Sequence, residues 1–259
     1  MKQRSSLLFL VVFFVLAFFA QPFAQKELPK SQLFLMHEDE VIPYKAGQYE
    51  AALKDFVKMF SDAKVENRSY NVVQGDYFTY TSVIPVTDFD GLAKYFGMTP
   101  DIIKKIGEDK FDAQMKKFDG CYNTHRNYLM TLRNDLSYKP EYALNPDDGI
   151  NFRHFDYLYV VPGKEDEMTA LLKEWKALYE SKKIEEGYRV YMGSIGTEFG
   201  MVLFVQPAKS RSDWAILSDK QDEIFGKDYQ KLWDKTVAIT QKFEHKNAMM
   251  RPDLSYRPK

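Results

Sequence analysis

Two copies of one short motif carry the residues best suited to binding an anion in this 259-residue chain. Residues 133–140 read Arg-Asn-Asp-Leu-Ser-Tyr-Lys-Pro, and residues 251–258 read Arg-Pro-Asp-Leu-Ser-Tyr-Arg-Pro. An arginine can hold a carboxylate or a phosphate through two parallel N–H bonds, and a tyrosine can add a hydroxyl donor. One hypothesis therefore surrounds an anionic ligand with Arg133, Tyr138, Arg251 and Tyr256.

The same motif also has a purely structural interpretation. An arginine near the end of a helix suits the helix dipole, and the aspartate of the following turn can accept bonds from backbone amides. Leu-Ser-Tyr then alternates as a strand does, and proline ends it. The pattern favours this interpretation, because a requirement of folding would act on both copies alike.

Histidine is the other residue type whose chemistry could matter here, because it titrates near neutrality. The run His37-Glu38-Asp39-Glu40 suggests a metal cluster, but in a strand only His37 and Asp39 share a face. Two ligands are too few, so we expect no metal site. A pocket role for His37, as a general base or a ligand donor, is the remaining functional hypothesis, and His125 fits the apolar stripe of a predicted helix.

No catalytic residue can be assigned from the sequence. It contains no Ser-His-Asp signature, phosphate-binding loop, zinc pattern or dinucleotide fingerprint. Cys121 is the single cysteine, and we interpret it as a buried thiol. We therefore expect no cofactor.

The elements that must position these residues follow the same order in both halves of the chain. Hydrophobic periodicity in the first half predicts strands at 33–42, 69–74 and 77–86, helices at 45–60 and 88–96, and helical spacing from 99 to 132. In the second half it predicts strands at 155–161, 188–192 and 201–205, a helix at 164–179, a short helix from 212, and a longer helix at 229–243.

The halves also align with each other. The alignment has no gap from Asp101 and Asp219 to the ends of the two motifs, at an offset of 118 residues, and Pro43 meets Pro162 at an offset of 119. We infer a duplicated β-α-β-β-α-β unit of the ferredoxin-like kind, so the fold class is α+β. The predicted boundaries are a signal peptide at 1–24, a first repeat at 25–140, a linker at 141–152 and a second repeat at 153–259.

One segment of the second half resembles a known superfamily. The run from Val160 to Met168, Val-Val-Pro-Gly-Lys-Glu-Asp-Glu-Met, is similar to the start of the helix in dimeric α+β barrel proteins, which include antibiotic-biosynthesis-monooxygenase-like and NIPSNAP-like domains. The first copy departs from this pattern, with Tyr44 in place of the glycine. The resemblance implies two units packed as one intramolecular α+β barrel, and it admits cofactor-free monooxygenase or haem-handling chemistry.

The start of the chain predicts export. Lys2 and Arg4 precede an unbroken apolar run from Leu7 to Ala20, which is the layout of a signal peptide and is short for a membrane span. We expect cleavage after Ala24, no membrane span thereafter, and a periplasmic or extracellular location in a bacterium. The mature chain then carries 34 basic and 37 acidic residues, which does not suit a nucleic-acid partner.

These observations favour an exported, non-catalytic protein that binds a small apolar or aromatic ligand, as a monomer or a homodimer. The alternative is an enzyme of the cofactor-free monooxygenase or haem-handling type. Strand tyrosines are expected to line the cavity in either case, and they are Tyr77, Tyr80, Tyr157, Tyr159 and Tyr191.

Overall fold

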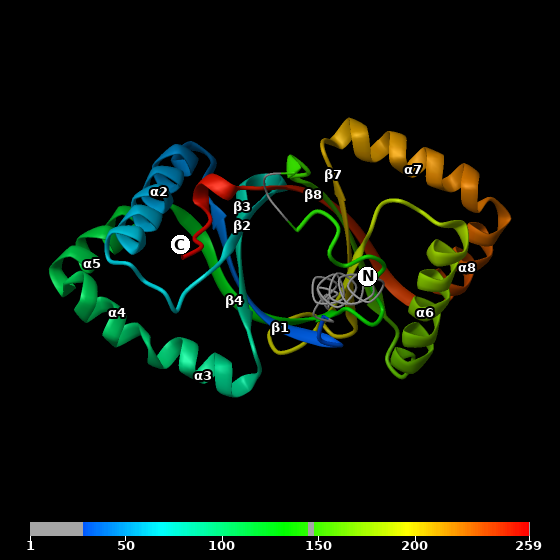
Figure 1. Ribbon diagram of the computed structural model, residues 1–259, viewed down its shortest axis with the longest axis horizontal. Coiled ribbons are helices and arrows are strands. Elements are labelled where there is room, and N and C mark those ends of the chain that lie inside the picture. Colours follow the sequence, from blue (N-terminus) through cyan, green and yellow to red (C-terminus); the bar gives the residue numbers. More distant parts are fainter. Residues whose placement is uncertain (1–27, 145–147, 259) are drawn as a thin grey trace, which may run out of the picture.

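A computed structural model describes residues 28–144 and 148–258, and both halves show the same order of elements (Figure 1). The first half contains β1 (Ser31–Val41), α2 (Ala46–Asp62), β2 (Asn71–Gly75), β3 (Thr79–Val86), α3 (Phe89–Gly97), α4 (Thr99–Ile106), α5 (Glu108–Met115) and β4 (Tyr122–Arg133). The second half contains β5 (Phe152–Val160), α6 (Glu165–Lys182), β6 (Arg189–Gly193), β7 (Met201–Ala208), α7 (Arg211–Phe225), α8 (Lys227–Ala238) and β8 (Thr240–Met250). The predicted signal peptide lies outside the described residues and stays a prediction.

The eight strands form one closed barrel in the order β1-β3-β2-β8-β5-β7-β6-β4, and every neighbouring pair is antiparallel. Each half contributes four adjacent strands, with its first strand between its third and its last. The halves meet edge to edge, where β2 pairs with β8 and β4 pairs with β6. Closure removes the free strand edges that each half would otherwise expose. The predicted α+β fold, with two ferredoxin-like units packed as one barrel, is therefore confirmed.

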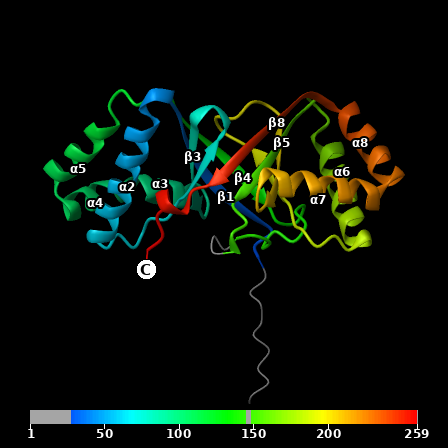
Figure 2. The ribbon, with the colours of Figure 1, turned by 90° about the horizontal axis from the view of Figure 1, so that it is seen from above.

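Helices cover the barrel on two opposite sides (Figures 1 and 2). On the first side, α2 presents Tyr49, Leu53 and Phe60 to the outer face of its own four strands. On the second side, α6 does the same with Leu172 and Trp175. The molecule thus has one core beneath each helical layer and a third, smaller core inside the barrel.

The prediction of long helices before each motif was wrong. Residues Tyr122–Arg133 and Thr240–Met250 are strands, and both pair along their length with the first strand of their own half. In the first half, Gly120 has φ of +65°, a conformation that ends the helical segment well before the motif. The apolar residues therefore keep a helical spacing beyond the end of this helical segment. There, pairing with β1 makes the chain a strand in spite of that spacing.

Each motif packs into the core of the opposite half. Leu136 and Tyr138, from the first copy, belong to the core beneath α6, whereas Leu254 and Tyr256, from the second copy, belong to the core beneath α2. Backbone bridges fix this exchange, because Tyr138 pairs with Tyr188 and Tyr256 pairs with Tyr70. Figure 1 shows the result, with the C-terminus beside α2. The motif is a turn followed by this isolated bridge, in place of the short strand that the sequence suggested.

Candidate functional site in the barrel interior

The barrel encloses a cavity of about 250 Å³ with mostly apolar walls. Strand alternation points every second side chain inward, so each wall is built from residues two apart in the sequence. The inward-facing apolar side chains that line the cavity include Phe34, Met36, Met130, Phe155, Leu203 and Val205. Tyr157 and Tyr191, two of the strand tyrosines that the sequence singled out, also line it.

Two buried arginines, Arg153 and Arg189, add positive charge to this apolar wall. Burial and the neighbouring Arg189 charge lower the pKa of Arg153 to about 10, and burial also lowers the pKa of Arg189. Both guanidinium groups therefore remain charged at neutral pH. Since charge is costly to bury, their partners matter.

Those partners are backbone carbonyl oxygens of the segment 140–152. Arg153 donates to the carbonyls of Ala143, Ile150 and Phe152 over 2.7–3.0 Å, and Arg189 donates to the carbonyl of Pro140 over 2.8 Å. Among the residues that the structure describes, no carboxylate forms an ion pair with either arginine. Neutral carbonyls compensate the two charges only in part, so this end of the cavity is suited to an anion.

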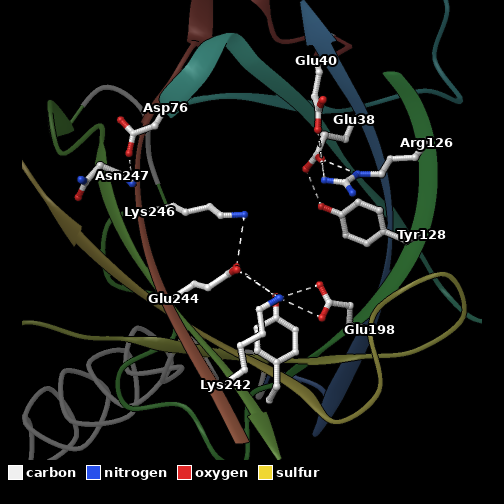
Figure 3. A network of polar contacts seen from close by, with 11 residues as sticks. Glu38, Glu40, Asp76, Arg126, Tyr128, Glu198, Lys242, Glu244, Lys246 and Asn247 are labelled. Carbon is white, nitrogen blue, oxygen red and sulfur yellow. Dashed lines mark hydrogen bonds and ion pairs between the residues drawn. The ribbon is translucent and has the colours of Figure 1, made fainter. Parts of the chain in front are cut away.

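The other end of the interior is charged and internally neutralised (Figure 3). On one wall, the buried Glu38 carboxylate accepts hydrogen bonds from Arg126 Nε over 2.7 Å and from the Tyr128 hydroxyl over 3.0 Å. On the facing wall, Lys242 and Lys246 of β8 flank Glu244 at 3.2 Å and 3.7 Å. Because each charge here has a partner, this end is less suited than the arginine end to recruiting an ion.

Tyrosines connect the two ends of the interior. Tyr128 and Tyr157 both line the cavity, and burial followed by the Glu38 charge raises the pKa of each hydroxyl above the ordinary tyrosine value. Both therefore stay protonated at neutral pH. Tyr128 already donates to Glu38, so its ring, rather than its proton, faces the space.

The arginines of the repeated motif lie outside this cavity and bind internal carboxylates. Arg133 forms a two-pronged pair with Asp135, through bonds of 2.8 Å and 2.7 Å. Arg251 forms the same pair with Asp253 at 2.9 Å for both bonds, and it also binds Glu50 of α2 over 2.7 Å and 2.8 Å. Arg133 ends a strand and does not lie beside a helix end as expected, and the arginine is the main hydrogen-bond partner of the aspartate in both copies.

The tyrosines of the motif are also engaged internally. The Tyr138 hydroxyl donates to the Ile184 carbonyl over 2.8 Å, and the Tyr256 hydroxyl donates to the Val65 carbonyl over 2.7 Å. These contacts support the structural interpretation of the motif. The hypothesis of an anion bound by Arg133, Tyr138, Arg251 and Tyr256 stays a prediction, and the structure does not bring the two copies together.

His37 lies on the outer face of β1 and does not line the cavity. Its Nδ1 atom is 3.0 Å from the Asn127 side-chain oxygen, and its ring lies at an edge against His125 with ring centres 4.5 Å apart. His125 lies in β4, not on the apolar face of a helix as expected. A third ligand thus joins His37 and Asp39, which removes the reason for expecting no metal at this position.

Sequence reasoning missed Arg153 and Arg189, the two buried arginines that line the cavity. A signal was present for Arg153, since it continues the alternation of Phe155, Tyr157 and Tyr159 along one face of β5. For Arg189 the decisive fact is three-dimensional, because β6 and β5 both pair with β7 and this places the two arginines on neighbouring parts of one wall.

Solved structures share this architecture. An anthrone oxidase-like protein matches at a TM-score of 0.57 and 17% identity, over 86% of this chain and 92% of that one. A candidate monooxygenase from Fusobacterium nucleatum matches at 0.55 and 16%, over 86% and 94%, and another from Lactobacillus acidophilus at 0.55 and 6%, over 88% and 97%. No family model and no curated protein matches the chain. The likeness confirms the dimeric α+β barrel fold that the sequence suggested.

Proposed function

We propose that the protein binds a small aromatic or apolar carboxylic acid inside its barrel, after export from the cell. One observation carries this proposal: an apolar cavity whose walls include two buried guanidinium groups that form no ion pair with a carboxylate of the described residues. A volume of about 250 Å³ lies just below the usual range for ligand pockets, which favours a ligand of one or two rings. No helix in the described part of the chain is long and apolar enough to cross a membrane.

Two contributions would give the selectivity. Phe155, Tyr157 and Tyr191 offer aromatic surface to the body of the ligand, and burial of that body removes apolar area from water. Arg153 and Arg189 would receive the carboxylate, which gives the two buried like charges an opposite charge between them. A neutral analogue of the same shape gains the first contribution but not the second.

The test is isothermal titration calorimetry with matched pairs of ligands. Benzoate and 2-naphthoate are each compared with the corresponding primary amide. We expect one acid to bind at one site per chain, and its amide to bind at least about tenfold more weakly, as the loss of one charge-assisted hydrogen bond would require. Equal affinity of acid and amide would overturn the assignment of the arginines, and absence of any binding would overturn the proposed ligand class.

Matched substitutions locate the site. Val83 lines the cavity, so Val83→Phe should fill it and weaken binding of the acid by at least about tenfold. Val237 of α8 is 40% exposed and lies outside the barrel, so Val237→Phe is the control and should leave binding unchanged. Arg153→Met should remove the preference for the acid over its amide.

A cofactor-free oxygenase is the second candidate, because the cavity places the Tyr128 ring beside the buried Glu38 carboxylate. Arg126, Thr81 and Tyr128 donate hydrogen bonds to this carboxylate, and it would polarise a phenolic substrate through Tyr128. Oxygen consumption with hydroxylated aromatic acids tests this role, and Glu38→Gln should abolish it while leaving binding of the acid intact.

The haem-handling alternative would need an iron ligand from the cavity wall. Among the described residues that line it, none is a histidine or a cysteine, so a tyrosine or a methionine would have to serve. All four histidines of the chain lie on the outer face of the barrel strands instead.

A further inference from the structure

The four histidines of the chain fall into two matched groups, one in each half. In the first half, His37 and Asp39 of β1 lie directly opposite Asn127 and His125 of β4. In the second half, His154 and Asp156 of β5 lie directly opposite Asn247 and His245 of β8. Each group thus consists of His-x-Asp on the first strand and His-x-Asn on the last strand, with all four side chains on the face away from the barrel interior.

Two contacts have the same length in both groups. The first-strand histidine places its Nδ1 atom 3.0 Å from the asparagine oxygen in both halves. The last-strand histidine places its Nδ1 atom 2.7 Å from the aspartate Oδ1 atom in both halves. In each group, the two histidines and the aspartate offer ligand atoms that all lie within 4.8 Å of one another.

Simple repetition of one half does not explain this match. The register shift falls after Glu40 in β1 and after Tyr159 in β5, and aligning the two shifts sets His37 against Asp156 and Asp39 against Leu158. The second group is instead displaced by two residues along both of its strands, towards the start of β5 and the end of β8. Two residues is the repeat of a strand, so the displaced group keeps the same face and the same opposite partners. The arrangement of the four residues is thus common to both halves although their positions are not.

The arrangement suits a transition-metal ion. Two imidazoles and one carboxylate are typical ligands of zinc, and three protein ligands leave a position open for water or a substrate. The asparagine oxygen can hold the Nδ1–H of the first histidine and so direct its Nε2 atom to the metal, as outer-shell partners do. This Nε2 atom is 3.8 Å from Asp39 Oδ2 in one group and 3.1 Å from Asp156 Oδ1 in the other. Two atoms bound to one zinc ion at about 2.0–2.2 Å each are separated by about 3–4 Å.

In each group, a side chain from a covering helix holds one of the proposed ligands in place, and another proposed ligand is exposed to solvent. In the first group, the Tyr49 hydroxyl of α2 donates to Asp39 over 2.6 Å, while the His125 side chain is 43% exposed. In the second group, Trp214 of α7 stacks on His154 with ring centres 3.8 Å apart, while the His245 side chain is 59% exposed. Both groups therefore have one rigid side and one side open to solvent.

We propose that each half binds one divalent transition-metal ion of the zinc class, through His37, Asp39 and His125 in the first half and through His154, Asp156 and His245 in the second. These sites lie on the outer face and are separate from the ligand proposed for the barrel interior.

Zinc titration of the untagged protein tests the proposal, since a polyhistidine tag would itself bind zinc. With 1 mM magnesium present to occupy surface carboxylates, we expect calorimetry to give two zinc ions per chain. His125→Gln and His245→Gln change exposed side chains and should each bind one ion, and the double variant should bind none. Cobalt(II), added to the wild type, should give visible absorption bands that the same two substitutions remove stepwise.

Further variants separate ligation from a structural role. Cys121→Ser is the control and should keep both ions, because Cys121 is buried and belongs to neither group. Asn127→Leu should fold and should weaken zinc binding in the first half by about 10–100-fold, the usual effect of losing an outer-shell partner. No zinc binding by the wild type, or two ions bound by the double histidine variant, would overturn the proposal. In that case the four residues of each group would serve only to pair the strands.

Discussion

At the scale of single residues, the repeated motif differs from what its composition suggests. Arginine and tyrosine in two copies are typical of anion binding, yet all of their described partners are internal. Ser137 and Ser255 complete the set, since each hydroxyl donates to the carbonyl of the arginine four residues before it and accepts the backbone N–H of a strand in the opposite half. The motif therefore joins the two halves of the chain.

A matched pair of substitutions tests this role of the motif. Tyr256→Phe leaves the Val65 carbonyl buried without its donor, and we expect a loss of about 1–2 kcal/mol in the free energy of unfolding. Tyr138→Phe should cost less, because the Ile184 carbonyl retains Lys139 Nζ at 2.8 Å. Urea denaturation of both variants measures the difference, and the reverse order would show that the hydroxyl contacts do not carry the stability.

At the scale of elements, the sequence predicted what local chemistry determines. The strand at 33–42, the helix at 45–60 and the hairpin around Gly75 and Asp76 were confirmed to within a few residues, because periodicity and turn residues are local signals. The strands β4 and β8 were missed, because their mixed burial patterns follow from pairing with distant strands. The His-x-Asp and His-x-Asn groups depend on those same two strands, so they could not be recognised before the strands were.

The ion pairs of Arg133 and Arg251 also predict how the stability of the fold changes in acid. Hydrogen bonds from Arg251 lower the pKa of Glu50 in α2 and of Asp253, and those from Arg133 lower the pKa of Asp135. A carboxyl whose pKa is lower in the folded than in the unfolded protein stabilises the fold above the unfolded value of about 4, and this contribution is lost as the pH falls through the folded value. We therefore expect the free energy of unfolding to be level from pH 7 to about 5 and to decline below that.

Substitution identifies the source of this decline. Glu50→Gln should reduce the difference in unfolding free energy between pH 7 and pH 3, because one carboxyl with a lowered pKa is gone. Glu174→Gln alters an exposed carboxylate paired with Lys235 and serves as the control. An unchanged pH dependence in Glu50→Gln would assign the acid response to other groups.

At the scale of the whole molecule, the architecture was predictable and the content of the interior was not. The order of elements and the internal alignment indicated two ferredoxin-like units in one barrel, because that topology follows from the sequence of strands and helices. The cavity and its arginines depend on which strands become neighbours on closure, such as β6 beside β7 and β4. The sequence placed the end of the first repeat at residue 140. Leu136 and Tyr138 lie before that boundary, but they pack in the core of the second half.

This exchange predicts how the halves behave when they are made separately. A chain of residues 28–144 lacks Leu254 and Tyr256, both part of the core beneath α2, and a chain of residues 148–258 lacks Leu136 and Tyr138 beneath α6. Leu136 and Leu254 are fully buried, and removing such a side chain alone costs about 2–5 kcal/mol, a large part of the stability of a domain. Neither half should therefore be a folded monomer.

Each half still carries its own copy of the motif, with the same leucine, serine and tyrosine. Two copies of one half could therefore exchange motifs with each other, as the two halves do in the intact chain. We expect sedimentation velocity and circular dichroism to find each half either unfolded or folded as a homodimer, and an equimolar mixture to form the 1:1 pair with the far-ultraviolet spectrum of the intact protein. A half that unfolds cooperatively as a monomer would contradict this account, because its core would then be complete without the partner's motif.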